Sequence, residues 1–286
     1  MNISEKAWTA YTRQLARLNE KAGQLLADYI AAHGTGDTEA LIDYAYALVT
    51  KYGEGSAALA AQMYDELAAL QNVRVPPAEP APTAQYGEVA KMVQATRESP
   101  PQMQRGVSRL VKRAGADTTL KNAQRDGAEF AWVPHGDSCA FCLTLASRGW
   151  QRASQAAIRG GHAEHIHANC DCEYAVRFDG RTSVAGYDPE AYLAQYNAAG
   201  GDINRMRRVN YAANKERINA QKRAAYAARV ENQKKDAIIK ADTVGLDNDR
   251  YTIAEPKISQ YLLKPEAKHA AEFFDAGYSE TDTERL

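Results

Sequence analysis

The chain has 286 residues, with 35 Lys and Arg against 36 Asp and Glu, and 45% of its residues are hydrophobic. This composition is typical of a soluble protein of one or two domains, and it excludes collagen, a polyampholyte tail and a membrane protein. No apolar stretch approaches the roughly 20 residues needed to cross a bilayer, and the first residues lack the apolar core of a signal peptide. We therefore expect a protein of a reducing cytoplasm, or one released from it, with no membrane partner.

Residues 1–72 show a helical pattern, because their apolar residues recur at alternating steps of three and four. The pattern predicts a first helix capped by Asn2 or Ser4 and stopped by Gly34. A second helix is expected to close at Gly53, and a third to start at Ser56. This part of the chain is thus predicted to form a helical hairpin or small bundle.

A proline-rich segment follows, with four prolines among the seven positions from Pro76 to Pro82. Proline removes a helix donor and favours an extended polyproline conformation. We therefore interpret residues 73–86 as a linker between domains.

Residues 87–180 change from helical to mixed patterning. Helices are expected over 87–96, 101–114 and 117–126, and short strands over 129–133 and 172–176. The predicted fold class is therefore α+β and predominantly α-helical, with a helical N-terminal part followed by a small α+β module.

The C-terminal third is expected to be helical and basic. Asp188-Pro189 predicts a helix start and Gly200-Gly201 its end. Residues 202–235 hold ten Lys and Arg against three Asp and Glu, a local charge of +7, and no steady apolar stripe continues after Val209. Residues 181–240 are therefore expected to form a polar and basic helical segment. A short C-terminal appendage with its own helix is expected over 241–286.

This basic segment has two interpretations: a solvated helix face, or a rod whose cations contact phosphates without reading bases. The second is favoured because no ordinary core would hold such a helix. The candidate nucleic-acid-binding residues are Arg205, Arg207, Arg208, Lys215, Arg217, Lys222, Arg223 and Arg229.

All four cysteines lie between Cys139 and Cys172, as a Cys-x2-Cys pair and a Cys-x-Cys pair, with three histidines before the second pair. Thiolate and imidazole suit tetrahedral zinc, which would fasten a module whose own core is small. Reduced core cysteines and a disulfide formed after release are the alternatives. The candidate ligands of this structural zinc are Cys139, Cys142, His167, Cys170 and Cys172.

Catalytic interpretations of the same residues fit less well. His162-Ala163-Glu164 resembles the His-x-Glu of zinc deaminases, but here the Cys-x2-Cys precedes the histidine instead of following it. The spacing of His162, Glu164 and His165 also differs from His-Glu-x-x-His. We therefore expect no enzyme activity.

The middle of the chain resembles a known phage family. The segment from Asn122 to Pro134, Asp137-Ser138-Cys139-Ala140-Phe141-Cys142 and the closing His167-Ala168-Asn169-Cys170-Asp171-Cys172 are similar to the Mu F-like minor head proteins of tailed bacteriophages. The family's usual Arg between the last two cysteines is Asp171 here. The resemblance covers roughly residues 120–176, and the stretch from Ile258 also looks like the opening of a small phage-borne domain.

The resemblance implies a minor capsid protein of the virion, located in the phage head interior, and in the host cytoplasm during assembly. Its implied partners are the portal and capsid proteins, and its implied role is head morphogenesis and the packaging or delivery of double-stranded DNA, bound non-specifically. The alternative is a metal-dependent nuclease or toxin carried in the virion, with His162, His165 and His167 as activating groups.

Overall fold

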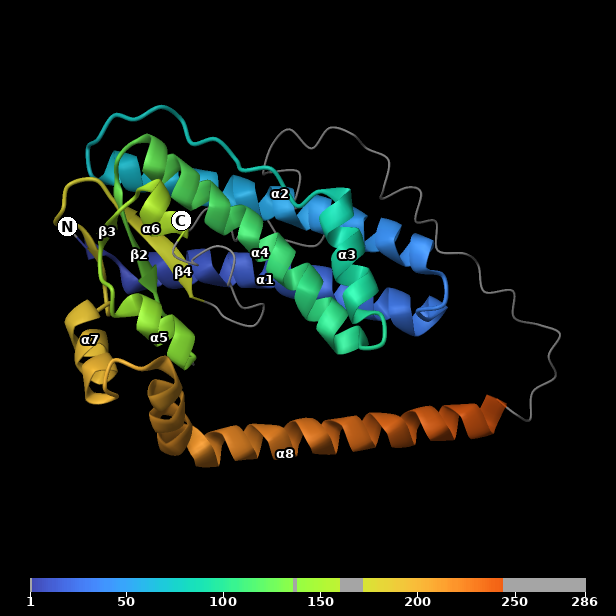
Figure 1. Cartoon of the computed structure of the whole chain (residues 1–286). Coiled ribbons are helices and arrows are strands. Elements are labelled where there is room, and N and C mark those ends of the chain that lie inside the picture. The colour runs from blue at the N-terminus through green and yellow to red at the C-terminus, as the bar shows by residue number, and fades with distance from the viewer. Residues whose placement is uncertain (1, 136–137, 160–171, 244–286) are drawn as a thin grey trace.

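The computed structural model describes residues 2–135, 138–159 and 172–243 (Figure 1). The fold is predominantly helical with small sheets, so the predicted α+β class is confirmed. A helical bundle forms one part, and a three-stranded sheet lies at one end of it. The bundle contains α1 (Glu5–His33), α2 (Thr38–Leu70), α3 (Tyr86–Thr96) and α4 (Pro100–Arg125).

The first helix begins and ends where its sequence predicts. The Ser4 side chain accepts a hydrogen bond from the Ala7 amide (3.2 Å), which satisfies one of the amides left open at a helix start. Gly34, at φ 72°, receives the chain as it leaves α1, in a conformation that glycine adopts without strain. Asp37 caps α2 in the same way, through the Ala40 amide (3.1 Å).

The predicted break at Gly53 is wrong, because α2 continues through it to Leu70. The break expected between Ala114 and Asp117 is also wrong, because α4 runs unbroken through Gly115. Both glycines lie where another segment approaches the helix closely. A Cβ on Gly115 would lie 2.6 Å from Ser56 Oγ, and one on Gly53 would lie 2.8 Å from Thr83 Cγ2. These glycines therefore permit close packing and do not end helices.

The proline-rich segment, interpreted as a linker, lies against α2 and α4 as an extended strap (Figure 1). Small side chains three residues apart face the helices: Ala78 is half-buried, and Ala81 and Ala84 are buried, whereas the prolines are exposed or nearly so. A three-residue period is that of a polyproline helix. The extended conformation is thus as expected, and the same segment is packed on the bundle.

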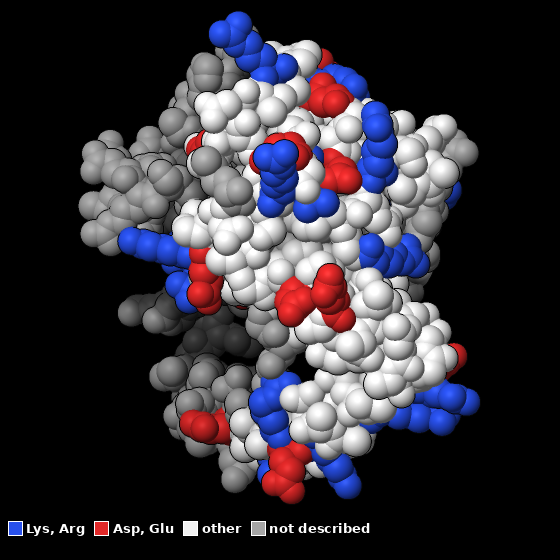
Figure 2. Space-filling view, turned by 90° about the vertical axis from the view of Figure 1, so that its left-hand side faces the viewer, with Lys and Arg blue, Asp and Glu red and all other residues white. Residues whose placement is uncertain are grey.

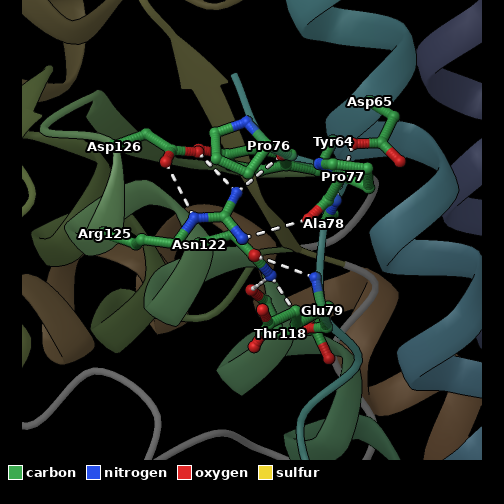
Figure 3. Close-up of polar contacts among 10 residues, drawn as sticks. All are labelled: Tyr64, Asp65, Pro76, Pro77, Ala78, Glu79, Thr118, Asn122, Arg125 and Asp126. Atoms are coloured by element: carbon green, nitrogen blue, oxygen red, sulfur yellow. Dashed lines mark hydrogen bonds and ion pairs between the residues drawn. The ribbon is translucent and has the colours of Figure 1, made fainter.

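Helix side chains satisfy the strap's backbone groups (Figure 3). Asn122 of α4 both accepts from the Glu79 amide (3.0 Å) and donates to the Glu79 carbonyl (2.9 Å). Asp65 accepts from the Ala78 amide (2.9 Å), and Thr118 accepts from the Ala81 amide (2.9 Å). An extended chain without sheet partners needs such side-chain partners when it packs on a core.

Arg125 binds the start of the strap. Its guanidinium donates to the Pro76 and Pro77 carbonyls (2.8 and 3.0 Å) and to Asp126 (2.8 Å). The hydrogen bond from Arg125 lowers the pKa of the Asp126 carboxyl, and the Tyr64 hydroxyl, which donates to it at 2.7 Å, lowers it further. Burial, together with this carboxylate, raises the pKa of Tyr64. Asp126 therefore stays ionised and holds α2 and α4 together.

Both predicted strands are present. β2 (Glu129–Val133) is the centre of the sheet and pairs antiparallel with β3 (Gln151–Arg152) and β4 (Glu173–Arg177). At the chain's start, β1 (Asn2–Ile3) pairs in parallel with β5 (Ser183–Val184). One apolar cluster includes side chains of α1, α2, α4 and the sheet, so the bundle and the small module share a core.

The remaining elements follow the sheet strands along the chain. α5 (Ala140–Ala146) and α6 (Gln155–Arg159) lie between β2 and β4, and α7 (Pro189–Ala198) and the long α8 (Ile203–Thr243) follow β5. Asp188 caps α7, and Gly200 and Gly201 end it at positive φ, as predicted. None of the helices described is both long and apolar enough to span a bilayer. The appendage expected over 241–286 lies outside the described residues beyond Thr243.

The Gly115 contact yields a stability prediction. We expect Gly115→Ala to lower the free energy of unfolding by about 1–3 kcal/mol, because overpacking against Ser56 outweighs the preference of about 1 kcal/mol for alanine in a helix. Gly87→Ala in α3 is the control, since nothing lies within 4 Å of the added methyl group, and it should be neutral or stabilising. Urea unfolding of both variants measures the difference, and equal stabilisation by both would contradict the close packing.

Candidate functional site

The first cysteine pair lies at the start of α5. Cys139 is the residue before the helix, and Cys142 is in its first turn and buried. One helical turn brings the two sulfurs to the same side, where Cys139 Sγ and Cys142 Sγ are 3.7 Å apart. The Cys-x2-Cys spacing thus places both sulfurs at one point.

Cys172, which comes directly before β4, is fully buried near this pair. Its Sγ lies 3.2 Å from Ser138 Oγ, and Ser138 is the residue before Cys139. Cys142 and Cys172 belong to the same apolar cluster, and Cys139 packs against it. Two stretches that are distant in the sequence therefore meet here.

The distance between the two sulfurs, 3.7 Å, suits two ligands of one metal ion. Two thiolates bound to tetrahedral zinc at about 2.3 Å lie about 3.8 Å apart, whereas a disulfide requires about 2.05 Å. The same separation also suits a thiol hydrogen bond between Cys139 and Cys142. The donor chemistry of the described cysteines therefore fits zinc.

The rest of the predicted ligand set cannot be placed in the same way. Cys170 and His167, like His162 and His165, lie outside the described residues, in the segment 160–171. Among the residues that the structure describes, no group of three or more His, Cys, Asp and Glu is arranged to hold a metal ion. Zinc binding stays a prediction that rests on Cys139, Cys142 and Cys172.

A buried ion pair positions Cys172. Lys112 of α4 lies 3.0 Å from Glu173 Oε1, with side chains that are 2% and 5% exposed. The same ammonium donates to the Cys172 carbonyl (2.9 Å) and lies 5.9 Å from the centre of the Trp132 ring. Both charges are thus compensated within the core, and the backbone at Cys172 is attached directly to the bundle.

Aromatic rings surround the ion pair and the thiols. Tyr174 packs edge-on against Trp132, with ring centres 4.6 Å apart, and burial raises its pKa well above the usual value. Burial also raises the pKa of Tyr11, and the neighbouring Glu173 carboxylate adds to the effect. These hydroxyls remain neutral at physiological pH, so the site presents no phenolate.

The start of α8 docks on this cysteine segment. Met206 is 3% exposed and packs with Ala140 of α5 and Ala199 at the end of α7. Asn210 of α8 donates to the Ser138 carbonyl (3.3 Å). A hollow of about 380 Å³ separates the two segments farther along, between Pro134 and Leu143 on one side and Asn214 and Arg217 on the other. α8 is therefore held at its first turns by the cysteine module.

After these turns α8 changes direction, and the remainder extends as a straight rod (Figure 1). All predicted nucleic-acid-binding residues lie on α8. The side chain of Arg229 is not among those that the structure describes. The other seven cations are exposed: Arg205, Arg207, Arg208, Lys215, Arg217, Lys222 and Arg223.

Most of these cations share one side of the helix. At about 100° per residue, Arg205, Arg208, Lys215, Lys222 and Arg223 fall within an arc of about 100°. Met206, Asn210 and Asn214, which face the body, are centred about 170° away. We call the five cations the cationic face of α8, and around the helix it lies opposite the side chains that dock on the module.

The body lacks such segregation on the face shown in Figure 2, where acidic and basic side chains are interspersed. Interspersed charges give a weak local potential, whereas a row of like charges attracts a polyanion. On chemical grounds α8 is thus the candidate contact for nucleic acid.

Sequence reasoning identified the cysteines and the cations but not the groups that position them. The sequence predicts that Lys112 lies in a helix of the middle module, but it gives no signal for the distant partner Glu173. Ser138 belongs to the Asp137–Cys142 motif, which indicates no role for the Ser138 hydroxyl. A lysine in a buried helical stretch is the one available signal, since lysine is almost never fully buried unless paired.

Comparison with families of known proteins shows that residues 2–199 match a family described as VG15 protein. No curated protein and no solved structure matches the chain. The matched range covers the bundle, the sheet and α7, and it ends just before α8 begins at Ile203.

The buried ion pair predicts that substitution of one partner lowers the free energy of unfolding much more than substitution of both partners. Lys112→Ala should lower the free energy of unfolding by about 3–5 kcal/mol, because it leaves the Glu173 charge buried without compensation. Lys112→Met with Glu173→Leu should recover most of that loss in urea unfolding. Glu88→Gln, which breaks the more exposed ion pair with Arg113, is the control and should cost about 1 kcal/mol or less. A double variant as unstable as Lys112→Ala would contradict the assignment.

The thiol geometry predicts a bound metal. Elemental analysis of the purified protein should find zinc in stoichiometric amount, and Cys139→Ser should lose most of it together with several kcal/mol of stability. Thr144→Ala changes the same helix but no sulfur, so its metal content should equal that of the wild type. Wild-type protein that is metal-free, with a melting temperature unchanged in Cys139→Ser, would rule out the zinc site.

Proposed function

Because the chain belongs to the VG15 protein family, a family of phage proteins, we propose that it is a Mu F-like minor head protein. In this proposal the protein acts with the portal and capsid proteins, in the phage head interior, in head assembly and in the packaging or delivery of DNA. The family match supports a phage protein, and the motifs around Cys139 and Cys172 support the Mu F-like assignment within it.

The observation that carries the DNA part of the proposal is the cationic face of α8. Its side chains are exposed, they lie on one side of the helix, and only Glu216 and Glu231 oppose them between Ile203 and Glu231. A row of cations neutralises phosphates and releases counterions, so it binds DNA without regard to sequence. Non-specific contact suits a protein that meets a whole genome.

The anchoring of α8 gives this contact a direction. Met206 and Asn210 attach the first turns to the cysteine module, while the rest of the 41-residue helix, after Asn210, is about 50 Å long. A rod fixed at one end holds its cations at a distance from the bundle. The bundle is then left available to bind portal or shell while the rod reaches DNA.

In this proposal zinc has a structural role. Cys139 directly precedes α5, and Cys142 lies in its first turn. α8 docks on α5, and Cys172 comes directly before β4. A metal held by Cys139 and Cys142 together with ligands from the second cysteine stretch would fix α5, and through it the base of α8, to the sheet. When bound, the metal would cross-link the two segments and would have no catalytic role.

Removal of charge from the cationic face tests the DNA contact. Arg208→Gln with Lys215→Gln and Lys222→Gln should weaken binding to a 30-base-pair duplex and reduce the slope of log K against log salt by about 2–3, since each phosphate contact contributes about 0.9. The matched control neutralises three exposed cations of the bundle and strap, Arg74, Lys91 and Lys121, and should leave the slope unchanged.

Three outcomes would each overturn part of the proposal. Equal slopes for the two triple variants would make α8 an ordinary solvated helix. Cleavage of the duplex by the wild-type protein in Mg²⁺ or Zn²⁺ would instead favour the virion-carried nuclease. Quantitative mass spectrometry of intact particles should find the chain in few copies, and its absence from them would reject the head assignment.

A further inference from the structure

The exposed part of α8 contains a repeated six-residue pattern. Arg208-Val-Asn-Tyr211-Ala-Ala is followed, farther along the helix, by Arg223-Ala-Ala-Tyr226-Ala-Ala. Each copy places an arginine three residues before a tyrosine and two alanines after it. Residues three apart on a helix are neighbours, so each tyrosine has an arginine beside it on the preceding turn.

Both tyrosines are well exposed: Tyr211 at 45% and Tyr226 at 63%. Except for Tyr86, every other tyrosine of the described residues is buried or half-buried. An aromatic ring gains free energy from burial against a ligand, and these two exposed rings are accessible for such a contact.

The rings lie on the same side of α8 as the cations. At about 100° per residue, Tyr211 and Tyr226 are about 60° apart, and both fall in or next to the arc of Arg208, Lys215 and Lys222. They are about 22 Å apart along the axis. Met206 and Asn210, which dock on the body, face the opposite side, so the rings do not belong to the docking surface.

Cations alternating with exposed aromatic rings match one class of ligand in particular. Single-stranded nucleic acid offers phosphates to the cations and unpaired base faces to the rings, and stacking of a base on an aromatic side chain adds substantially to affinity. A duplex offers the phosphates alone, because its base faces are already stacked on each other. The exposed alanines that directly follow the tyrosines, Ala212 and Ala227, are too small to block the approach of a base from that side.

We propose that α8 binds single-stranded nucleic acid in preference to duplex, with one base stacked on Tyr211 and another on Tyr226. The inference rests on the proposed function, since the cationic face supplies the phosphate contacts common to both ligands. It adds a substrate class: DNA whose bases are unpaired.

Fluorescence anisotropy with full-length protein tests the proposal with two labelled probes, a 30-nucleotide oligo(dT) and a 30-base-pair duplex, at one salt concentration. Wild-type protein should bind oligo(dT) more tightly. Tyr211→Ala with Tyr226→Ala should weaken oligo(dT) binding by about tenfold or more and duplex binding by less than about twofold. Tyr211→Phe with Tyr226→Phe keeps the rings and should restore wild-type binding.

Val209→Ala is the matched control, because Val209 is 60% exposed on the same helix and lies outside the arc of the rings. Circular dichroism should show equal helix content in all variants. Equal binding of both probes, with no effect of the tyrosine substitutions, would overturn the stacking proposal and leave the phosphate contact intact. Absence of binding to either probe would overturn the proposed function itself.

Discussion

The contact of Lys112 with Glu173 and the Cys172 carbonyl joins the two halves of this molecule. Lys112 belongs to the buried face of α4, and Glu173 begins the strand that follows the second cysteine stretch. A charge pair this deep contributes little net stability, because desolvation of both ions offsets their attraction. It does penalise every alternative register of β4, since a shift by one residue would bury each charge without its partner. The contact therefore specifies where Cys172 lies.

The other constraints follow from that register. With Cys172 fixed, its sulfur meets Ser138, and the residues after Ser138 begin α5 with Cys139 and Cys142 on one side. α5 in turn provides apolar side chains for Met206, so the direction of α8 is set at the same place. The bundle, the cysteines and the basic rod are thus connected by a chain of direct contacts. A family match that ends at residue 199 covers every element in that chain except the rod.

Local sequence patterns predicted the local structure, but they did not predict which distant segments each residue contacts. Asp188 marks a helix start because capping depends on a few adjacent residues. The predicted helix end at Gly53 is wrong for the opposite reason: the role of this glycine is set by Thr83 of the strap, and a glycine that ends a helix looks the same in the sequence as one that permits close packing. Four prolines predict extended chain, but nothing in them shows that side chains of α4 hold it on the bundle. The Cys-x2-Cys spacing predicted that its two sulfurs meet, because one helical turn suffices. That Lys112 contacts the backbone at Cys172 depends on packing that no short pattern encodes.

Charge segregation decides how a chain of net charge −1 can bind a polyanion. Since residues 202–235 carry +7, the remainder of the sequence carries −8, of which residues 1–201 carry −3 and residues 236–286 carry −5. The bundle is close to neutral, so the attraction of a polyanion is concentrated on α8, and it acts over about 8–10 Å at physiological salt. From Lys215 onward the cations lie about 13 Å or more along the helix from Met206, which exceeds that distance. In the proposed function, DNA therefore contacts α8 and not the bundle, and Tyr211 and Tyr226 are exposed beside these cations.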